Sequence, residues 1–392
     1  MVSAPSFACT PSNPRIVAGS SSFRPPHLQS AKKSAHSPPV AAIRHNHGKS
    51  ATLKRCSLWL VILGLLSLGA APALALWTTR SGARPDRLIT IREIASRCGL
   101  EVSTPGKKIV LRGQTALVEI STEGREARVN AQQIWLHAPP ARSWGRWCLT
   151  ETDAQKIIVP LLSPASYLRG YGTAVVVLDP GHGGNDPGAS SRRGLIEPRI
   201  ALDIAKRVRA KLINEGFHAY LTRDVDRFIE LDTRPRLAAA RHADLFISIH
   251  LNAAASRDSH GIETYVLTSP GFPSTSGSNG ENSSKNNICF PANARDVANN
   301  IFGYYLQKNL RTAAQAEDRG VRHARFVVLK EAPCVAALVE CGFLSNAADE
   351  RRLMTDEHRD AIATGIAKGI IEYGRAVRRA NPAPPPTQKT NG

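Results

Sequence analysis

Acidic residues are absent from the start of the chain. The first 56 residues contain no Asp or Glu, against eight Lys or Arg, and many of the others are Ser or Pro. They have no helical or strand period, so residues 1–56 are predicted to be a disordered basic leader. Two explanations of its length are open: translation that starts just before Leu58, or an organellar transit segment, which has a similar composition.

An apolar run at residues 58–71 follows two basic residues and ends in small residues around Pro72. This is the layout of a secretory signal with a cleavage site. A retained membrane anchor is the alternative, because residues 58–77 are just long enough to span a bilayer. We favour cleavage, since Pro72 and its alanine neighbours weaken the end of the span. Either way, the rest of the chain is expected to be exported to the periplasm or cell envelope. Membrane contact is expected only through residues 57–77, and only if they are not cleaved.

Patterns typical of nucleic-acid binding are also missing, although the chain is basic. Its net charge is +19 at pH 7, and eight of these charges belong to the leader, which leaves +11 for the exported part. A basic balance favours an anionic partner. No helix-turn-helix and no module of interleaved aromatic and basic residues is present, so we expect no nucleic acid. Given export, the anionic partner is expected to lie outside the cytoplasm.

Two candidate metal ligands stand where elements meet loops. An apolar, β-branched run at 174–179 stops at Pro180 and three glycines, which present His182 on a tight loop. Glu197 directly precedes Pro198 and an apolar pattern of helical spacing over 198–214. Since proline fits the first turn of a helix, Glu197 is expected at the N-terminal end of that helix.

Two further candidates end predicted strands. His250 closes the strand 244–250, with Asn252 in the following loop, and Glu340 ends the apolar run 335–340. In an α/β sheet, ligands bind beyond the carboxyl ends of the strands. A lone histidine at such a place is usually structural, and a glutamate at a helix start is usually there for the helix dipole. An unpaired carboxylate that ends an apolar run is harder to explain without a metal or donor. Taken together, the four residues predict a hydrolytic metal site.

Several motifs in register resemble the zinc-dependent N-acetylmuramoyl-L-alanine amidases, which hydrolyse cell walls. The resemblance covers about residues 173–376 and rests on Asp-Pro-Gly-His-Gly-Gly at 179–184, Glu197, Thr-Arg at 222–223, the run 243–252 and Val-Glu-Cys-Gly-Phe-Leu-Ser-Asn at 339–346. The chain departs from the family at Pro198, where a polar residue is usual, and in a polar insertion at 269–294.

The resemblance implies a division of roles among the four residues. His182, Glu197 and His250 would bind Zn²⁺, and Glu340 would be the catalytic base. Three protein ligands leave a position open for water, which ionises near pH ~7 when zinc binds it. Asp179 and Asn252 are candidates for orienting the ligands or the substrate, unless Asp179 simply caps its turn.

The expected substrate is peptidoglycan, cleaved between N-acetylmuramic acid and L-alanine, with an activator protein as an expected further partner. Two alternatives are a zinc peptidase that acts within the stem peptide and a non-catalytic wall-binding protein. Retention of Glu340 argues against the second, because a binding module needs no base. The site chemistry alone does not separate the two hydrolases, since both cleave amides.

The predicted catalytic domain, residues 173–378, has the α/β pattern of a mixed, mostly parallel sheet of about six strands flanked by helices. Expected strands are 174–179, 218–223, 244–250, 261–268, 325–329 and 335–340, and expected helices are 198–214, 232–242, 295–315 and 357–378. The insertion has the composition of a flexible loop, and we hypothesise that it borders the active site and helps to select glycan strands. Residues 379–392 form a predicted disordered tail.

A smaller α+β module is predicted at residues 86–163. It has an amphipathic helix over 88–99, strands over 108–112, 116–121 and 127–136, and a closing apolar run at 157–160. It resembles the copper amine oxidase N-terminal-like domain, which implies no copper here, since the module has no His or Cys cluster of metal-ligand spacing. Wall attachment or spacing is its expected role, with plain packing as the alternative.

Five cysteines follow the leader, an odd number. Cys334 and Cys341 bracket one predicted strand, so roughly 23 Å would separate them at ~3.3 Å per residue, too far for a disulfide. A pair between Cys98 and Cys148 is open. Cys341 alternates to the face opposite Glu340 and is expected to pack in the core.

Overall fold

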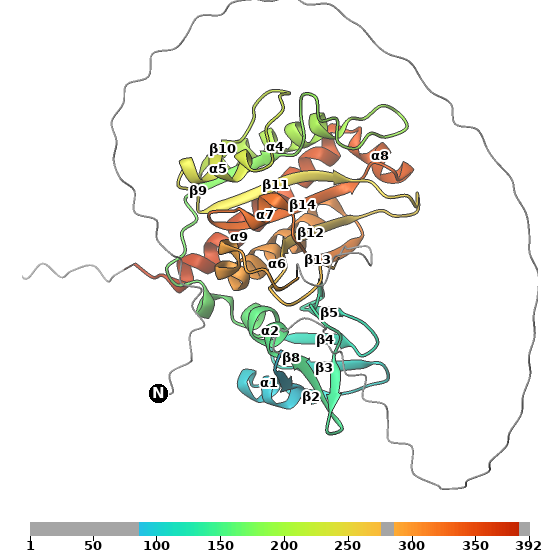
Figure 1. The fold of residues 1–392 in the computed structure, drawn as a ribbon, viewed down its shortest axis with the longest axis vertical. Coiled ribbons are helices and arrows are strands. Elements are labelled where there is room, and N and C mark those ends of the chain that lie inside the picture. Colours follow the sequence, from blue (N-terminus) through green and yellow to red (C-terminus); the bar gives the residue numbers. More distant parts are fainter. Residues whose placement is uncertain (1–85, 276–285, 384–392) are drawn as a thin grey trace, which may run out of the picture. The chain divides into compact units, whose positions relative to one another are not determined.

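The computed structural model describes residues 86–275 and 286–383 (Figure 1). The leader 1–56, the apolar segment 57–77, the centre of the polar insertion and most of the tail lie outside these residues. In the described ranges, no helix is both long and apolar enough to cross a membrane.

Six strands of the catalytic part lie side by side in the order β10-β9-β11-β14-β12-β13 (Figure 1). Only the β12–β14 pair is antiparallel, and the others are parallel. This confirms the predicted mixed, mostly parallel sheet. The strands are β9 (Val175–Pro180), β10 (His218–Leu221), β11 (Leu245–Asn252), β12 (Ile262–Leu267), β13 (Asp318–Ala324) and β14 (Val335–Phe343).

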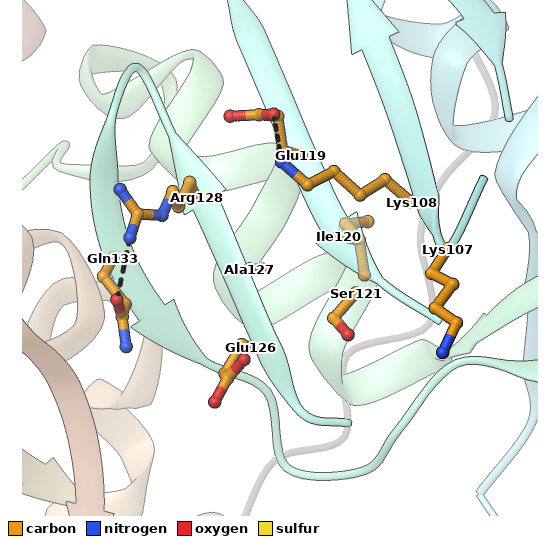
Figure 2. A pocket seen from close by; sticks show the side chains of 9 residues that line it. All are labelled: Lys107, Lys108, Glu119, Ile120, Ser121, Glu126, Ala127, Arg128 and Gln133. Carbon is orange, nitrogen blue, oxygen red and sulfur yellow. Dashed lines mark hydrogen bonds and ion pairs between the residues drawn. The ribbon is translucent and has the colours of Figure 1, made fainter. Parts of the chain in front are cut away.

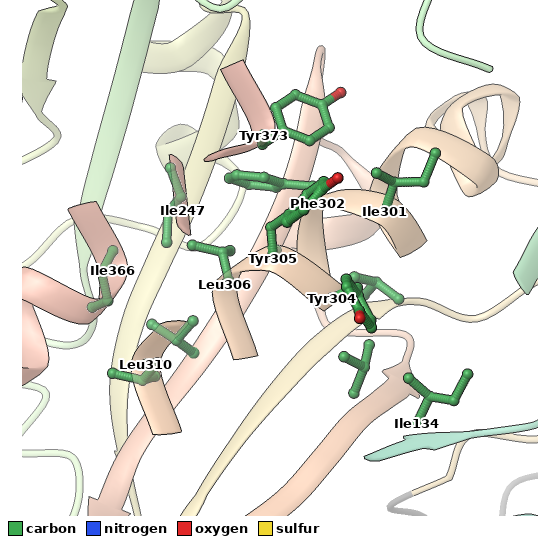
Figure 3. Close-up of a cluster of buried hydrophobic side chains, with 14 of the residues drawn as sticks. Ile134, Ile247, Ile301, Phe302, Tyr304, Tyr305, Leu306, Leu310, Ile366 and Tyr373 are labelled. Carbon is green, nitrogen blue, oxygen red and sulfur yellow. The ribbon is translucent and has the colours of Figure 1, made fainter. Parts of the chain in front are cut away.

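Helices cover both faces of this sheet, because its central strands are apolar on both sides. On one face, Ile247 and Ile249 of β11 pack in a cluster with α4, α6 and α9, part of which Figure 3 shows. On the other face, Phe246 and Leu338 pack against α5 and α7. The helices are α4 (Glu197–Asn214), α5 (Thr233–Ala240), α6 (Asp296–Ala314), α7 (Val327–Lys330), α8 (Ala347–Leu353) and α9 (Asp356–Ala380).

The N-terminal module has two small antiparallel sets of strands. The set β1-β8-β7 stands alone, whereas the meander β2 to β6 continues the catalytic sheet, because β6 pairs in parallel with β13 through Ile134 and Val321. The elements are β1 (Leu88–Thr90), α1 (Ile91–Cys98), β2 (Glu101–Ser103), β3 (Lys108–Arg112), β4 (Leu117–Ser121), β5 (Glu126–Val129), β6 (Gln132–Trp135), β7 (Ala141–Ser143), β8 (Arg146–Thr150), α2 (Glu151–Asp153), η1 (Ala154–Ile158), α3 (Val159–Leu162) and η2 (Pro164–Tyr167).

One predicted strand of the catalytic domain is wrong. The expected strand 325–329 overlaps the short helix α7, and the strand of this region is β13, which ends at Ala324. A short run such as Val-Val-Leu has no period that separates a buried helix from a strand. Position in the sheet decided the outcome, since β13 fills the space between β12 and β6.

Two predictions for the module need correction. The strand 127–136 is a hairpin, in which Asn130 and Ala131 both have positive φ, at 49° and 67°, as a two-residue turn requires. The helix 88–99 begins only at Ile91, because residues 88–90 pair with β8. The closing run 157–160, for which no element type was predicted, is helical.

The cysteine predictions hold where the structure describes them. Cys334 and Cys341 are free thiols, and Cys341 is buried in the core as expected. Cys98 and Cys148 are also free thiols, so the pair left open above is not formed.

Candidate metal centre

The loop after β9 presents His182 in a left-handed conformation, with φ at 57°. The glycines around it leave room for the other side chains of the site. A Cβ atom on Gly181 would collide with the imidazole of His250, and one on Gly188, where φ is +55°, would lie 2.7 Å from Oε2 of Glu197. The loop therefore needs glycine at both positions.

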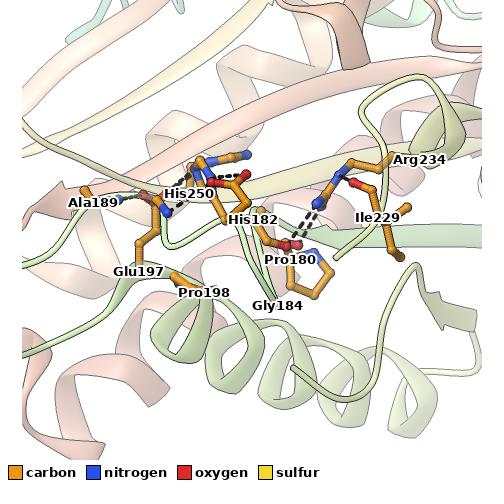
Figure 4. A network of polar contacts seen from close by, with 12 residues as sticks. Pro180, His182, Gly184, Ala189, Glu197, Pro198, Ile229, Arg234 and His250 are labelled. Carbon is orange, nitrogen blue, oxygen red and sulfur yellow. Dashed lines mark hydrogen bonds and ion pairs between the residues drawn. The ribbon is translucent and has the colours of Figure 1, made fainter. Parts of the chain in front are cut away.

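Three of the predicted residues converge at this loop. The candidate ligand atoms of His182, Glu197 and His250 all lie within 4.8 Å of one another. Oε1 of Glu197 lies 2.9 Å from Nδ1 of His250 and 3.3 Å from Nε2 of His182. Figure 4 shows the three side chains together. The two imidazole rings meet edge to face, with centroids 4.9 Å apart. His182 and His250, which are 68 positions apart in the sequence, thus come together because β9 and β11 are neighbours in the sheet.

Glu197 is the first residue of α4, followed by Pro198, as the sequence predicts. Its carboxylate accepts hydrogen bonds from the backbone N–H of Ala189, at 2.8 Å, and of Leu251, at 3.1 Å. Burial raises the pKa of Glu197, but hydrogen bonds from His182 and His250 outweigh it and hold that pKa far below its usual value. Glu197 is therefore an anion in the folded protein, as a metal ligand must be.

His182 has a partner that the sequence analysis missed. Its Nδ1 lies 2.8 Å from Oδ2 of Asp186, which leaves Nε2 directed at Glu197. Burial lowers the pKa of His182, but its hydrogen bonds with Glu197 and Asp186 outweigh this, so the net shift is upward. In metal sites, the second nitrogen of a ligating histidine commonly contacts a carboxylate. The four-residue spacing of His182 and Asp186 within one loop is the sequence feature that could have predicted this contact.

Two buried arginines hold the backbone of the histidine loop. Arg223 donates from Nη2 to the carbonyl oxygens of Gly181, at 2.7 Å, and of Pro198, at 2.8 Å. Arg234 donates to the carbonyl oxygens of Pro180 and His182, each at 2.9 Å (Figure 4). Arg223 belongs to a motif seen in the sequence, whereas Arg234 was missed, because nothing in its own helix marks it. Together they tie β9, the loop and the start of α4.

Asp179 is structural rather than in contact with substrate, because it is fully buried. It accepts hydrogen bonds from Thr222 at 2.7 Å, from Ser248 at 2.8 Å and from Arg234 at 2.9 Å. These bonds join three neighbouring strands and fix the guanidinium of Arg234. Asp179 thus supports the loop indirectly.

Glu340 lies beside this centre on β14, where it is opposite His250 of β11 in the strand register. Its Oε2 is buried and has no hydrogen-bond partner among the described residues. Burial raises the pKa of Glu340 well above its usual value, and the charges of Glu197 and Glu263 add to the effect. A shift of this direction is typical of carboxyl groups that take part in acid–base chemistry.

Glu263, which the sequence analysis missed, is opposite Glu340 on β12. Its Oε1 accepts hydrogen bonds from Asn252, at 2.7 Å, and from Tyr265, at 2.8 Å, and its Oε2 pairs with two arginines of β13. Asn252 is the last residue of β11 and not a loop residue. The sequence feature that could have pointed to Glu263 is a carboxylate in an apolar strand, which is also how Glu340 was identified.

A surface pocket of about 240 Å³ lies on the module, lined by side chains of β3 to β6 (Figure 2). Its charged residues pair locally, as between Lys108 and Glu119, 3.2 Å apart. None of its lining residues is among those of the metal centre, so this pocket is not the candidate active site.

Comparison with known proteins shows the family of the catalytic part. The family model described as N-acetylmuramoyl-L-alanine amidase matches residues 176–372. The amidase AmiA of Escherichia coli is 36% identical over 221 residues, which are 52% of this chain and 76% of that protein. The amidase LytC of Bacillus subtilis is 36% identical over 200 residues, 51% of this chain and 35% of that protein. A solved amidase structure from Clostridium difficile 630 is 30% identical, with 52% of this chain and 97% of that one covered and a TM-score of 0.43. The chain belongs to the N-acetylmuramoyl-L-alanine amidase family.

Proposed function

We propose that this chain is a zinc-dependent peptidoglycan hydrolase that cleaves the amide between N-acetylmuramic acid and L-alanine of the stem peptide. Membership of the amidase family supports the reaction class. The observation that carries the mechanism is the convergence of His182, Glu197 and His250 beside Glu340, a carboxyl group with an unpartnered buried oxygen.

The residues fit Zn²⁺ by their chemistry. Two imidazoles and one carboxylate are a ligand set that zinc takes in hydrolytic enzymes, with a fourth position left for water. Glu197 is held as an anion, and Nδ1 of His182 is engaged by Asp186, which favours Nε2 as its ligand atom. When bound, Zn²⁺ would supply Lewis acidity toward a water molecule and toward the amide carbonyl.

In this proposal, Glu340 moves the protons. Its unpartnered Oε2 accepts a proton from the attacking water and then gives it to the nitrogen of the departing alanine. The carboxyl group of Glu340 thus acts first as base and then as acid, and no serine or cysteine nucleophile is needed. Glu263 does not take this role, because both of its oxygens accept hydrogen bonds or ion pairs.

The proposal also covers the cellular location of the enzyme and its partners. We place the enzyme in the periplasm or cell envelope, as its exported substrate requires, and the apolar segment 57–77 supports export by its composition. The activator protein, and the likeness of the module to a copper amine oxidase N-terminal-like domain, stay predictions.

Digestion of purified sacculi with the full chain tests the reaction. Mass spectrometry is expected to find intact stem peptides with a free alanine amine. Shortened peptides would instead mean cleavage within the stem, and no release would mean a binding protein. Treatment with a zinc chelator is expected to stop release and added Zn²⁺ to restore it, whereas release that survives complete metal removal would contradict the zinc mechanism.

A further inference from the structure

Polar side chains form a row on one face of the sheet, from the metal centre to the N-terminal module. We call Glu340, Glu263, Arg319, Arg322 and Trp135 the polar row. Strand register places Glu340 opposite Glu263, and Arg322 opposite Tyr265, two residues beyond Glu263 on the same face. Trp135 follows Ile134, the residue of β6 that pairs with β13. The row therefore crosses four adjacent strands, β14, β12, β13 and β6.

The two arginines of the row carry more positive charge than their partner offsets. Nε of Arg319 and Nε of Arg322 pair with the same oxygen of Glu263, at 3.0 and 2.9 Å. One carboxylate thus faces two guanidinium groups. Across the part of the chain that the structure describes, neither terminal nitrogen of Arg322 donates a hydrogen bond. The side chains of Arg319 and Arg322 are 25% and 14% exposed, so a ligand can reach them.

The module fixes these arginines through Trp135. The indole N–H donates to the carbonyl oxygen of Arg319 at 3.0 Å, and the ring lies under the guanidinium of Arg322, 4.5 Å from its centroid. The strand pairing is held by Gln132 and Gln133, which both donate to the carboxylate of Asp318. A guanidinium stacked on an aromatic ring and ion-paired through Nε has few orientations left, so its free N–H groups are preorganised for a carboxylate.

The length of the row suits a short peptide. From His250 on β11 to Trp135 on β6 there are four strand intervals, or about 19 Å at ~4.8 Å each. An extended peptide of about six residues covers that distance at ~3.3 Å per residue. A stem peptide whose alanine amide lies at Glu340 would place its next residues over Arg319 and Arg322.

We propose that Arg319 and Arg322, held by Trp135 of the N-terminal module, form a subsite for a carboxylate of the stem peptide. This inference rests on the proposed amidase function and deepens it. The module then has a role beyond spacing the catalytic domain from the wall or packing against it, because it completes the peptide-binding side of the active site.

Three soluble substrates test the subsite with the full chain: a muramoyl stem peptide with free carboxylates, the same peptide with its carboxylates converted to carboxamides, and muramoyl-L-alanine alone. The wild type is expected to have about tenfold higher kcat/KM on the carboxylate than on the carboxamide peptide, since a charged hydrogen bond contributes about that factor. Arg322→Gln is expected to reduce this preference to about one, mainly through KM, and to lose about tenfold more on the carboxylate peptide than on muramoyl-L-alanine.

Trp135→Phe is a second variant, which keeps the aromatic ring but loses the bond to Arg319. It is expected to weaken the carboxylate preference severalfold. Trp144→Ala is the matched control on the same module, because Trp144 is 98% exposed and outside the row. Thermal unfolding and zinc content of each variant identify any that fail to fold.

The outcomes separate this inference from the proposed function. Equal turnover of the carboxylate and carboxamide peptides by the wild type, or equal losses of Arg322→Gln on all three substrates, would overturn the subsite while leaving the amidase intact. Failure of the wild type to cleave any muramoyl amide would overturn the proposed function itself.

Discussion

Glu340 and Glu263 lie directly opposite each other across β14 and β12, but only Glu263 is paired with positively charged side chains. Two arginines, a tyrosine and an asparagine contact Glu263, whereas Oε2 of Glu340 has no partner among the described residues. The same residue type in adjacent positions therefore has two roles. Glu263 organises the strands, and Glu340 is the residue that we propose exchanges protons.

Glu340→Gln is expected to reduce kcat by about 10²- to 10⁴-fold, because the amide cannot take up a proton from water. Zinc binding should stay near that of the wild type, since Glu340 is not among the three converging ligands. Turnover of sacculi and metal content, measured on the same samples, check both parts. Wild-type turnover in a zinc-loaded variant would refute the base.

Although Glu340→Gln is expected to lower activity, it is expected to raise the stability of the metal-free protein. Burial raises the pKa of Glu340 well above the 4.5 of an ordinary glutamate, so the folded chain keeps a proton that the unfolded chain releases. Stability is therefore lost as pH rises above about 4.5 toward the folded pKa. Glu340→Gln should unfold at a Tm roughly 2–4 °C above the wild type at pH 7, and at about the same Tm at pH 3.

Glu263→Gln is the matched comparison for that measurement. It leaves Arg319 and Arg322 facing each other without a carboxylate, which should destabilise the fold by about 3 kcal/mol at pH 7. Urea unfolding of the two variants in parallel measures the change in the free energy of unfolding, which should rise in Glu340→Gln and fall in Glu263→Gln. Equal effects of both substitutions would mean that the asymmetry between the two carboxyl groups is not real.

Arg234→Met is expected to weaken zinc binding by about 10- to 100-fold without removing a ligand. The reason is that Arg234 holds the carbonyl oxygens of Pro180 and His182 and so sets the position of the first histidine. Competition with a chromogenic chelator measures the affinity. Arg236→Met, on the exposed side of the same helix, is the control and should bind zinc like the wild type. Unchanged affinity in Arg234→Met would show that the loop needs no such support.

Gly188→Ala should reduce zinc affinity by at least about tenfold, because the new Cβ meets Oε2 of Glu197 in a backbone conformation that already costs about 1–2 kcal/mol for alanine. Gly194→Ala separates the two causes. Gly194 also has a positive φ, of +84°, but apart from its two chain neighbours no described residue has a heavy atom within 4 Å of the added Cβ. Calorimetric zinc titration of both variants is the measurement, and similar losses in the two would assign the effect to backbone strain alone.

Much of the catalytic sheet was predictable from local patterns. The helix from Glu197 follows from Pro198 and the apolar spacing after it, and the strands that carry His250 and Glu340 follow from their apolar runs. The strand β13 was not predictable in this way, since Asp318, Arg319 and Arg322 make it polar. It is a strand because β12 and β6 flank it and supply its hydrogen bonds.

The sequence by itself determined the residue types of the centre and the elements that carry them, because both depend on neighbours a few positions away. Only the tertiary structure decided which side chains support them. Arg234 reaches the backbone of His182 across 52 positions, and Trp135 of the module reaches Arg319 across 184. Such contacts depend on strand order and on the docking of the module, and no local pattern encodes either.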